Sequence, residues 1–356
     1  MPRDERREAG AVPARAGIPR VKEDSMRSEK ITIWREGEYH YPDAYGFVPF
    51  LTCYIHEDDK ARPAILQMPG GAYRKVAPSE AHLPAEGFYR AGYNVFVLTY
   101  TINYLDEPLR LQPLRDAARA IRLIRARAEA YRVRPSEIAV CGFSAGGHLA
   151  ASLCVHHGDI ADADAAYAGI SARPDGAVLC YPVITTGEYT HRDSVRALFG
   201  DAPTEEELKY MSLEHHVTED TPPSFLWQTA TDDAVPVENS YLYAMACRRY
   251  GVRFAHHVFS EGVHGMSCAT QQWLDRDFGE RYTTEQLCRL ADAIAAGKTG
   301  YPQELLPQMV ADCELDGKKK EKFPSEDKER IRDTLGEVGV WQSLACDWLQ
   351  KVLRKG

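Results

Sequence analysis

A serine lies at the centre of a glycine-flanked motif, Gly142-Phe143-Ser144-Ala145-Gly146. An apolar run, 138–141, precedes the motif and small residues follow it, which predicts a sharp turn between a strand and a helix. Such a turn presents the serine hydroxyl above the end of a sheet and leaves the Ala145 N–H unpaired at the start of the helix. Ser144 is therefore a candidate nucleophile, and Ala145 is a candidate donor to a tetrahedral oxyanion.

A serine hydroxyl is a weak nucleophile, so it requires a histidine as base and a carboxylate to orient that histidine. Asp232 follows the apolar run 224–229, and His264, flanked by glycines, follows the run 252–259. Asp233 competes with Asp232 for the role of the acid. We favour Asp232 because Val235 and Pro236, which usually anchor this loop, begin three residues after it. The chain order Ser, Asp, His is one of the known orders of such triads.

The loop after the apolar run 63–68 reads Pro69-Gly70-Gly71-Ala72-Tyr73. Glycines let backbone N–H groups approach a substrate carbonyl without obstruction, so Gly70 and Gly71 are candidate oxyanion donors alongside Ala145. In the absence of a nucleophile, the same glycines would be interpreted as a simple chain reversal. Tyr73 either forms a wall of the acyl pocket, and so contacts substrate, or packs in the interior.

The residues that must be positioned lie among alternating apolar runs and helical patterns. Strands are expected at 63–68, 94–100, 138–143, 177–181, 224–229 and 252–259, and helices at 111–131, 145–157 and 238–250. Strands that are apolar on both faces and alternate with helices indicate a parallel sheet covered on both sides. The predicted fold class is α/β, a doubly wound and mostly parallel sheet, which places Ser144, Asp232 and His264 at the same carboxyl edge.

The bulk composition excludes several classes of protein. The chain has 356 residues, 44% hydrophobic and 27% charged, which favours one globular domain that spans residues 31–356. Its net charge of −9 argues against nucleic-acid binding. None of the nine cysteines lies in a C-x-x-C pair, so we expect them to be buried thiols. The adjacent histidine pairs, such as His156-His157, make poor metal ligands. We expect no metal and no cofactor.

The first 30 residues are rich in charge and proline, which predicts a disordered leader without a signal-peptide core. No run approaches the roughly 18 apolar residues that a membrane span requires. We therefore expect a cytoplasmic protein with no membrane partner.

These motifs together resemble the α/β-hydrolase superfamily, and within it the bacterial acetyl esterase and acetylxylan esterase-like group related to hormone-sensitive lipase. The resemblance extends from about residue 31 to residue 266 and implies nucleophile Ser144, acid Asp232, base His264 and oxyanion donors at Gly70 or Gly71 and Ala145. The segments that carry it are Pro69-Gly70-Gly71-Ala72-Tyr73, 92–98, 114–120, Gly142-Phe143-Ser144-Ala145-Gly146-Gly147-His148, 221–227, 235–240 and His264-Gly265.

The chain departs from the family pattern in three places. Ala72 stands where the family often has a third glycine, and Gln228-Thr229-Ala230-Thr231-Asp232 stands where it often has His-Thr-Ala-Asp-Asp, which retains Asp232 and so supports it over Asp233. The third departure is an insertion at about 270–338 that separates His264 from an amphipathic final helix at 339–354.

The insertion contains a helical pattern that begins with Thr283 and Gln286 in the spacing of a capping box. A charged stretch, 314–332, follows it and favours a solvated appendage. An insertion that begins beside His264 is a candidate cover for the active site, and also a candidate contact between the subunits of a homo-oligomer.

The leading hypothesis is a serine carboxylic-ester hydrolase that acts through an acyl-enzyme intermediate. The family resemblance points to O-acetyl groups on xylo-oligosaccharides or related oligosaccharides, hence to a small-molecule or oligosaccharide ester as partner. One alternative is an amide or peptide hydrolase, such as an arylformamidase-like enzyme or a small peptidase, with the same triad. The other is a non-catalytic protein that binds an acylated ligand.

Overall fold

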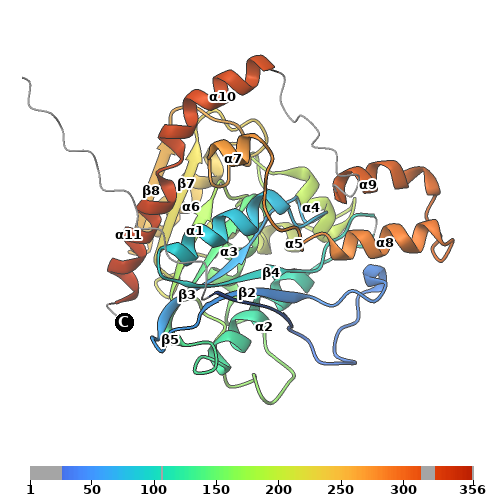
Figure 1. The fold of residues 1–356 in the computed structure, drawn as a ribbon, viewed down its shortest axis with the longest axis horizontal. Coiled ribbons are helices and arrows are strands. Elements are labelled where there is room, and N and C mark those ends of the chain that lie inside the picture. The colour runs from blue at the N-terminus through green and yellow to red at the C-terminus, as the bar shows by residue number, and fades with distance from the viewer. Residues whose placement is uncertain (1–25, 106, 314–324, 355–356) are drawn as a thin grey trace, which may run out of the picture.

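A mixed sheet forms the centre of the molecule (Figure 1). The computed structural model describes residues 26–105, 107–313 and 325–354. In this part of the chain, eight strands pair in the order β1-β2-β4-β3-β5-β6-β7-β8. β2 runs antiparallel to both of its neighbours, and the other pairs are parallel. The strands are β1 (Met26–Thr32), β2 (Phe50–His56), β3 (Arg62–Met68), β4 (Asn94–Thr99), β5 (Val133–Phe143), β6 (Gly176–Cys180), β7 (Ser224–Thr229) and β8 (Phe254–Phe259).

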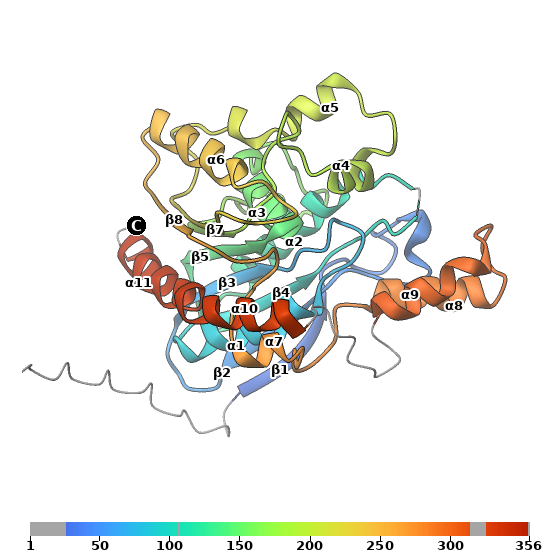
Figure 2. The ribbon, with the colours of Figure 1, turned by 90° about the horizontal axis from the view of Figure 1, so that it is seen from above.

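Helices cover both faces of the sheet (Figure 2). On one face lie α1 (His82–Arg90) and α11 (Trp341–Leu353), and on the other lie α2 (Gln112–Ala126), α3 (Ser144–His156) and α6 (Glu238–Arg249). Along β5, Ile138 and Val140 join the core under α2 and α3, whereas Ala139 and Cys141 join the core under α1 and α11. Burial on both faces explains the continuous apolar runs, and the predicted α/β class is confirmed.

The start of the domain differs from the prediction. Residues 26–30, which we expected in the disordered leader, belong to β1, while 1–25 lie outside the described residues. β1 is an edge strand that pairs only with β2, so its polar side chains at Ser28 and Lys30 stay exposed. An edge strand of this kind lacks the apolar run by which the other strands were predicted. β2 was not predicted either, although Phe50–Ile55 is buried throughout.

The insertion after His264 contributes four helices in its described part. They are α7 (Gln271–Leu274), α8 (Glu285–Ala295), α9 (Leu306–Cys313) and α10 (Ser325–Val338), and α8 and α9 project from one side of the molecule (Figures 1 and 2). Within the described ranges, every helix is too short or too polar to cross a membrane.

One expectation about this insertion was wrong. The Thr283 hydroxyl donates to the Val76 carbonyl at 2.8 Å, and the Gln286 amide exchanges two 2.8 Å hydrogen bonds with the backbone of Ile102. These side chains tie α8 to the main body instead of forming a capping box. Residues 325–332 of the charged stretch begin α10, where Ile331 is only 1% exposed while Glu329, Arg330 and Arg332 are exposed; residues 314–324 lie outside the described residues.

The remaining elements are short and lie in the connections between those above. They are α4 (Arg192–Phe199), α5 (Glu205–Tyr210) and the 3₁₀ turns η2 (Pro42–Ala44), η3 (Pro78–Glu80), η4 (Leu213–His215) and η5 (Gln303–Leu305).

Candidate active site

Ser144 lies on a strained turn between β5 and α3. Its φ is 52°, in the left-handed region that residues with a Cβ seldom adopt. The two flanking glycines make this turn feasible: a Cβ on Gly142 would lie 2.1 Å from the Gly146 carbonyl oxygen, and a Cβ on Gly146 would lie 2.1 Å from that of Met68. The geometry is that of a nucleophile elbow.

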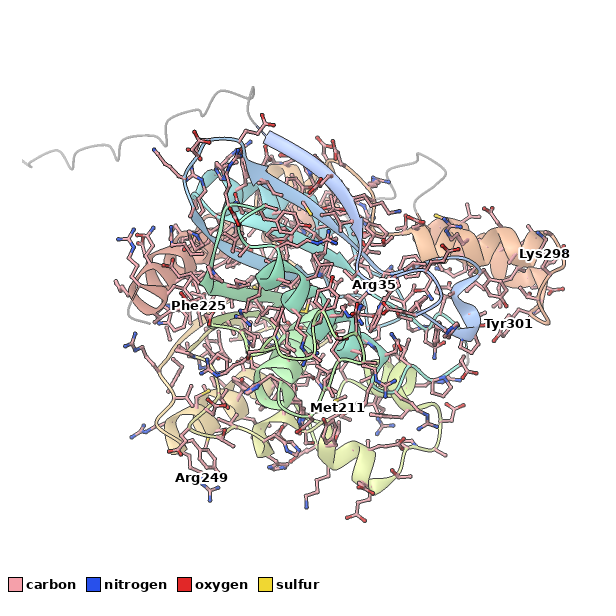
Figure 3. All side chains as sticks on the ribbon, turned by 90° about the horizontal axis from the view of Figure 1, so that it is seen from below. Arg35, Met211, Phe225, Arg249, Lys298 and Tyr301 are labelled. Atoms are coloured by element: carbon pink, nitrogen blue, oxygen red, sulfur yellow. The ribbon has the colours of Figure 1, made fainter. Side chains whose placement is uncertain are left out.

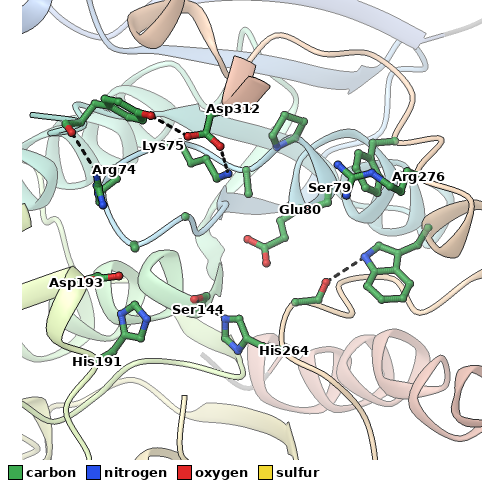
Figure 4. A pocket seen from close by; sticks show the side chains of 18 of the residues that line it. Arg74, Lys75, Ser79, Glu80, Ser144, His191, Asp193, His264, Arg276 and Asp312 are labelled. Atoms are coloured by element: carbon green, nitrogen blue, oxygen red, sulfur yellow. Dashed lines mark hydrogen bonds and ion pairs between the residues drawn. The ribbon is translucent and has the colours of Figure 1, made fainter. Parts of the chain in front are cut away.

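The structure brings the three candidate residues of the triad together. His264 Nε2 lies 2.8 Å from Ser144 Oγ, and His264 Nδ1 lies 2.8 Å from Asp232 Oδ2 and 3.0 Å from Oδ1 (Figure 4 shows Ser144 and His264). A proton on Nδ1, donated to Asp232, leaves the lone pair of Nε2 directed at the serine hydroxyl. This arrangement allows His264 to take the proton of Ser144.

The two adjacent aspartates hold different parts of His264. The side chain of Asp232 is 1% exposed, and besides the imidazole it accepts the backbone N–H groups of Ala234 and Val235 at 3.0 and 2.9 Å. Asp233 instead accepts the backbone N–H of His264 at 3.0 Å. The imidazole therefore contacts Asp232, as the loop sequence indicates, and Asp233 positions the histidine backbone.

The loop 69–73, which carries candidate oxyanion donors and is called the oxyanion loop below, differs from the prediction at Gly70. The Gly70 N–H donates to Glu80 Oε2 at 2.6 Å, so it is not available to an oxyanion. Gly71 has a φ of 118°, and no residue in the described ranges accepts a hydrogen bond from its N–H. Gly71 and Ala145 remain the candidate donors. Ala72 has a φ of 57°, a backbone conformation that glycine adopts with less strain than alanine.

Tyr73 packs in the interior, which is the second of the two alternatives given above, and does not line the cavity, so the structure contradicts a contact with substrate. The side chain is 1% exposed, and its hydroxyl lies 2.8 Å from His148 Nδ1. Burial lowers the pKa of His148 to about 4, so the ring is neutral and its Nε2–H donates to the Met211 carbonyl at 3.1 Å. Tyr73 thus ties the oxyanion loop to α3.

Sequence reasoning missed two residues that support the site. Glu80, in η3, is 4% exposed and accepts both the Gly70 N–H and, at 2.9 Å, the hydroxyl of Tyr181. The ring of Tyr181 packs edge-on against that of His264, with 5.0 Å between their centroids. Tyr181 directly follows β6, so its place at the carboxyl edge of the sheet was the available signal. Glu80 carried no such signal, because it lies in a connection.

A cavity of 580 Å³ lies above Ser144. His191 and Asp193, from the start of α4, line it beside His264. Burial is the main cause that lowers the pKa of His191, and the nearby His264 lowers it further. Residues of the insertion also form its walls, namely Trp273, Arg276, Phe278, Gln308 and Asp312.

The walls from the insertion are tied to the main body by hydrogen bonds. The Trp273 indole N–H donates to the Gly265 carbonyl at 3.0 Å, beside His264. Asp312 accepts the Tyr104 hydroxyl at 2.9 Å and pairs with Lys75 at 3.4 Å (Figure 4). The insertion therefore shapes the cavity that contains Ser144.

Comparison with known proteins places this site among hydrolases. The family model described as BD-FAE matches residues 51–246, more than half of the chain. The chain is 48% identical over 263 residues to endo-1,4-beta-xylanase B of Butyrivibrio fibrisolvens (74% of this chain, 41% of that protein). It is 26% identical over 226 residues to an acetylxylan esterase of Xylanibacter ruminicola (62% of this chain, 44% of that protein). The chain thus spans less than half the length of these curated relatives.

A solved structure gives a more complete match. The acetyl ester-xyloside bifunctional hydrolase of Caldicellulosiruptor lactoaceticus superimposes with a TM-score of 0.65 at 36% identity. The match covers 78% of this chain and 100% of that one.

Proposed function

The chain belongs to the BD-FAE family and has the fold of the α/β hydrolases, and from this premise we propose that it is a serine esterase that removes O-acetyl groups from carbohydrates. The observation that carries the proposal is the hydrogen-bonded series Ser144, His264 and Asp232 at the base of an open cavity. The names of the relatives, an acetylxylan esterase and an acetyl ester-xyloside hydrolase, support acetylated xylo-oligosaccharides as substrates.

In the proposed first half-reaction, Ser144 Oγ attacks the carbonyl carbon of the acetyl group while His264 Nε2 takes the hydroxyl proton. The carbonyl oxygen becomes an oxyanion, which the N–H groups of Gly71 and Ala145 bind. Asp232 stabilises the imidazolium through Nδ1. When the intermediate collapses, the bond to the sugar oxygen breaks and His264 protonates that oxygen, which leaves an acetylated Ser144.

In the second half-reaction, water takes the place of the sugar. His264 removes a proton from the water as it attacks the acetyl carbon, and the oxyanion again forms against Gly71 and Ala145. Collapse releases acetic acid and returns the proton to Ser144 Oγ. The chain's own groups carry out each proton transfer in this sequence.

Replacement of Ser144 by alanine tests the mechanism. We expect the Ser144→Ala variant to lose at least about a thousandfold in kcat on 4-nitrophenyl acetate and on acetylated xylo-oligosaccharides, because the nucleophile is absent, with an unchanged melting temperature. Acetate release, followed by mass spectrometry of the sugars, is the measurement. Near-normal turnover by the folded variant would overturn the proposal.

The same assay separates the alternative functions. Faster turnover of N-formyl aromatic amides than of acetylated sugars would favour an amide hydrolase with the same triad. A fluorophosphonate probe should label the native chain at Ser144 and leave Ser144→Ala unlabelled. Absence of labelling in folded native protein would instead favour a non-catalytic protein that binds an acylated ligand.

A further inference from the structure

A second cavity, of 320 Å³, adjoins the cavity that contains Ser144. Three residues, Arg74, Tyr104 and Asp193, line both cavities. Figure 4 shows Arg74 and Asp193 on one side of Ser144, with Arg276 on the opposite side. The second cavity therefore adjoins one defined side of the site, and a ligand that reaches Ser144 from this side passes Arg74 and Asp193.

Besides Arg74 from the loop after β3, three segments that are distant in the sequence build this second cavity. The loop after β4 contributes Asn103, Tyr104 and Leu105, α4 contributes Asp193, Arg196 and Ala197, and the insertion contributes Tyr301, Pro302 and Leu305. The second cavity exists in this form only because the insertion passes beside the main body.

Hydrogen bonds hold these walls to neighbouring parts of the chain. The Asn103 amide donates to the Ala197 carbonyl at 3.2 Å, which ties the loop after β4 to α4. The Tyr301 hydroxyl donates to Asp43 Oδ2 at 3.2 Å, which ties the insertion to η2 (Figure 3 shows Tyr301 on the projecting part of the insertion). The second cavity is therefore preorganised, which reduces the entropy lost when a ligand binds.

The side chains of the second cavity suit a neutral sugar. It combines two tyrosines with a planar amide, and pyranose rings bind such surfaces with their apolar face on an aromatic ring and their hydroxyls on polar groups. Acidic groups accompany its cations: Arg196 pairs with Asp201 at 2.8 Å, and Asp193 lines the cavity together with Arg74. Charged walls disfavour a long acyl chain, and paired charges give no excess attraction for an anionic ligand.

We propose that this second cavity is a sugar subsite, which binds units of a neutral oligosaccharide next to the acetylated unit held at Ser144. The inference rests on the proposed function for the identity of the acetylated unit. It adds that the enzyme prefers acetylated oligosaccharides over acetylated monosaccharides, and that the insertion confers this preference through Tyr301 and Leu305.

Substitutions at Tyr301 and Leu305 test the subsite, because both residues line only the second cavity. We expect Tyr301→Ala to weaken the binding of unacetylated xylotetraose about tenfold, the loss that corresponds to one aromatic contact of about 1.4 kcal/mol. Leu305→Trp should weaken it similarly by filling the cavity. Tyr301→Phe is the matched control, which keeps the ring and should bind within about threefold of the native chain. Isothermal titration calorimetry measures the Kd values.

Kinetics with acetylated substrates provide the second readout. In Tyr301→Ala, KM for acetylated xylotetraose should rise about tenfold with little change in kcat, whereas kcat/KM for 4-nitrophenyl acetate should stay within about twofold. Unchanged Kd and KM in both folded variants, Tyr301→Ala and Leu305→Trp, would overturn the subsite. Xylotetraose binding that depends on Tyr301 without any acetate release would support the subsite and overturn the proposed function, so the two failures are distinguishable.

Discussion

At the scale of single residues, one buried carboxylate connects the two halves of the site. Glu80 binds the Gly70 N–H with one oxygen and the Tyr181 hydroxyl with the other. The Tyr181 hydroxyl also accepts the backbone N–H of Ser267, and its ring supports His264. Glu80 therefore fixes the oxyanion loop on one side and the surroundings of the imidazole on the other, which makes it a positioning residue for both.

The two aspartates beside each other provide a prediction at this scale. Asp232→Asn should lower kcat by about 10⁴, because an amide no longer favours the proton on His264 Nδ1. Asp233→Asn should lower it less than about tenfold, because an amide oxygen can still accept the His264 backbone N–H. Steady-state kinetics on 4-nitrophenyl acetate compare the two variants. The reverse order of losses would show that Asp233 is the acid.

At the scale of elements, the parallel register brings the site together. Met68 of β3 pairs with Gly142 of β5, and Thr229 of β7 pairs with Phe259 of β8, so these strands end at one level. The loops that carry Gly71, Ser144, Asp232 and His264 follow directly. Side chains separated by up to 120 residues, as Ser144 and His264 are, meet because these strands end at a common edge.

The turn between β5 and α3 gives a prediction about stability. The three atoms nearest to a Cβ at position 146 would all be backbone atoms, from the carbonyls of Met68 and Pro69, which cannot move without displacing β3. Gly146→Ala should therefore destabilise the protein by about 3 kcal/mol or more. Gly158→Ala is the matched control, since a Cβ there meets no atom within 4 Å. Urea unfolding measures both, and equal stabilities would contradict the steric argument.

At the scale of the whole molecule, the insertion completes the cavity. Thr283 and Gln286 join its helix α8 to the main body, and Asp312 of α9 joins Tyr104 and Lys75 at the rim. Further along, α10 lies against α7, and α11 returns to cover the sheet. The insertion thus adds walls to a site whose reactive groups come from the sheet.

The pH dependence of global stability follows from His148, which is buried between Tyr73 and the Met211 carbonyl. Burial lowers its pKa from 6.5 to about 4 in the folded chain, so the unfolded chain binds more protons between these values. The stability contributed by neutral His148 is complete above pH 6.5 and is lost as the pH falls toward 4. At pH 5 this loss is about 2 kcal/mol relative to pH 7.5.

A His148→Gln variant isolates this contribution, because glutamine does not titrate and its amide can still donate to the Met211 carbonyl. Urea unfolding at pH 7.5 and pH 5.0 gives the change for each protein. We expect the native chain to lose about 2 kcal/mol more than the variant. Equal losses would show that another group controls the acid sensitivity, and the buried His156, whose pKa burial also lowers, would be the next candidate.

The sequence by itself determined the features that arise from local pattern. Apolar runs predicted the buried parallel strands, and glycines at 142 and 146 predicted the elbow, because a backbone this tight admits no Cβ. Ser144, Asp232 and His264 could be chosen as candidates because each directly follows a recognisable strand. Their catalytic roles stay predictions that the kinetics above will test.

Only the tertiary structure decided the features that depend on partners far away in the chain. Gly70 cannot donate to an oxyanion because Glu80 accepts its N–H, and the Tyr73 side chain lies in the interior because its hydroxyl hydrogen-bonds to His148. The edge strand β1 and the contacts of Thr283 and Gln286 likewise depend on residues brought together by folding. A sequence pattern shows which groups a residue carries, but a hydrogen bond or a cavity wall requires the position of a second residue, which only the packed chain provides.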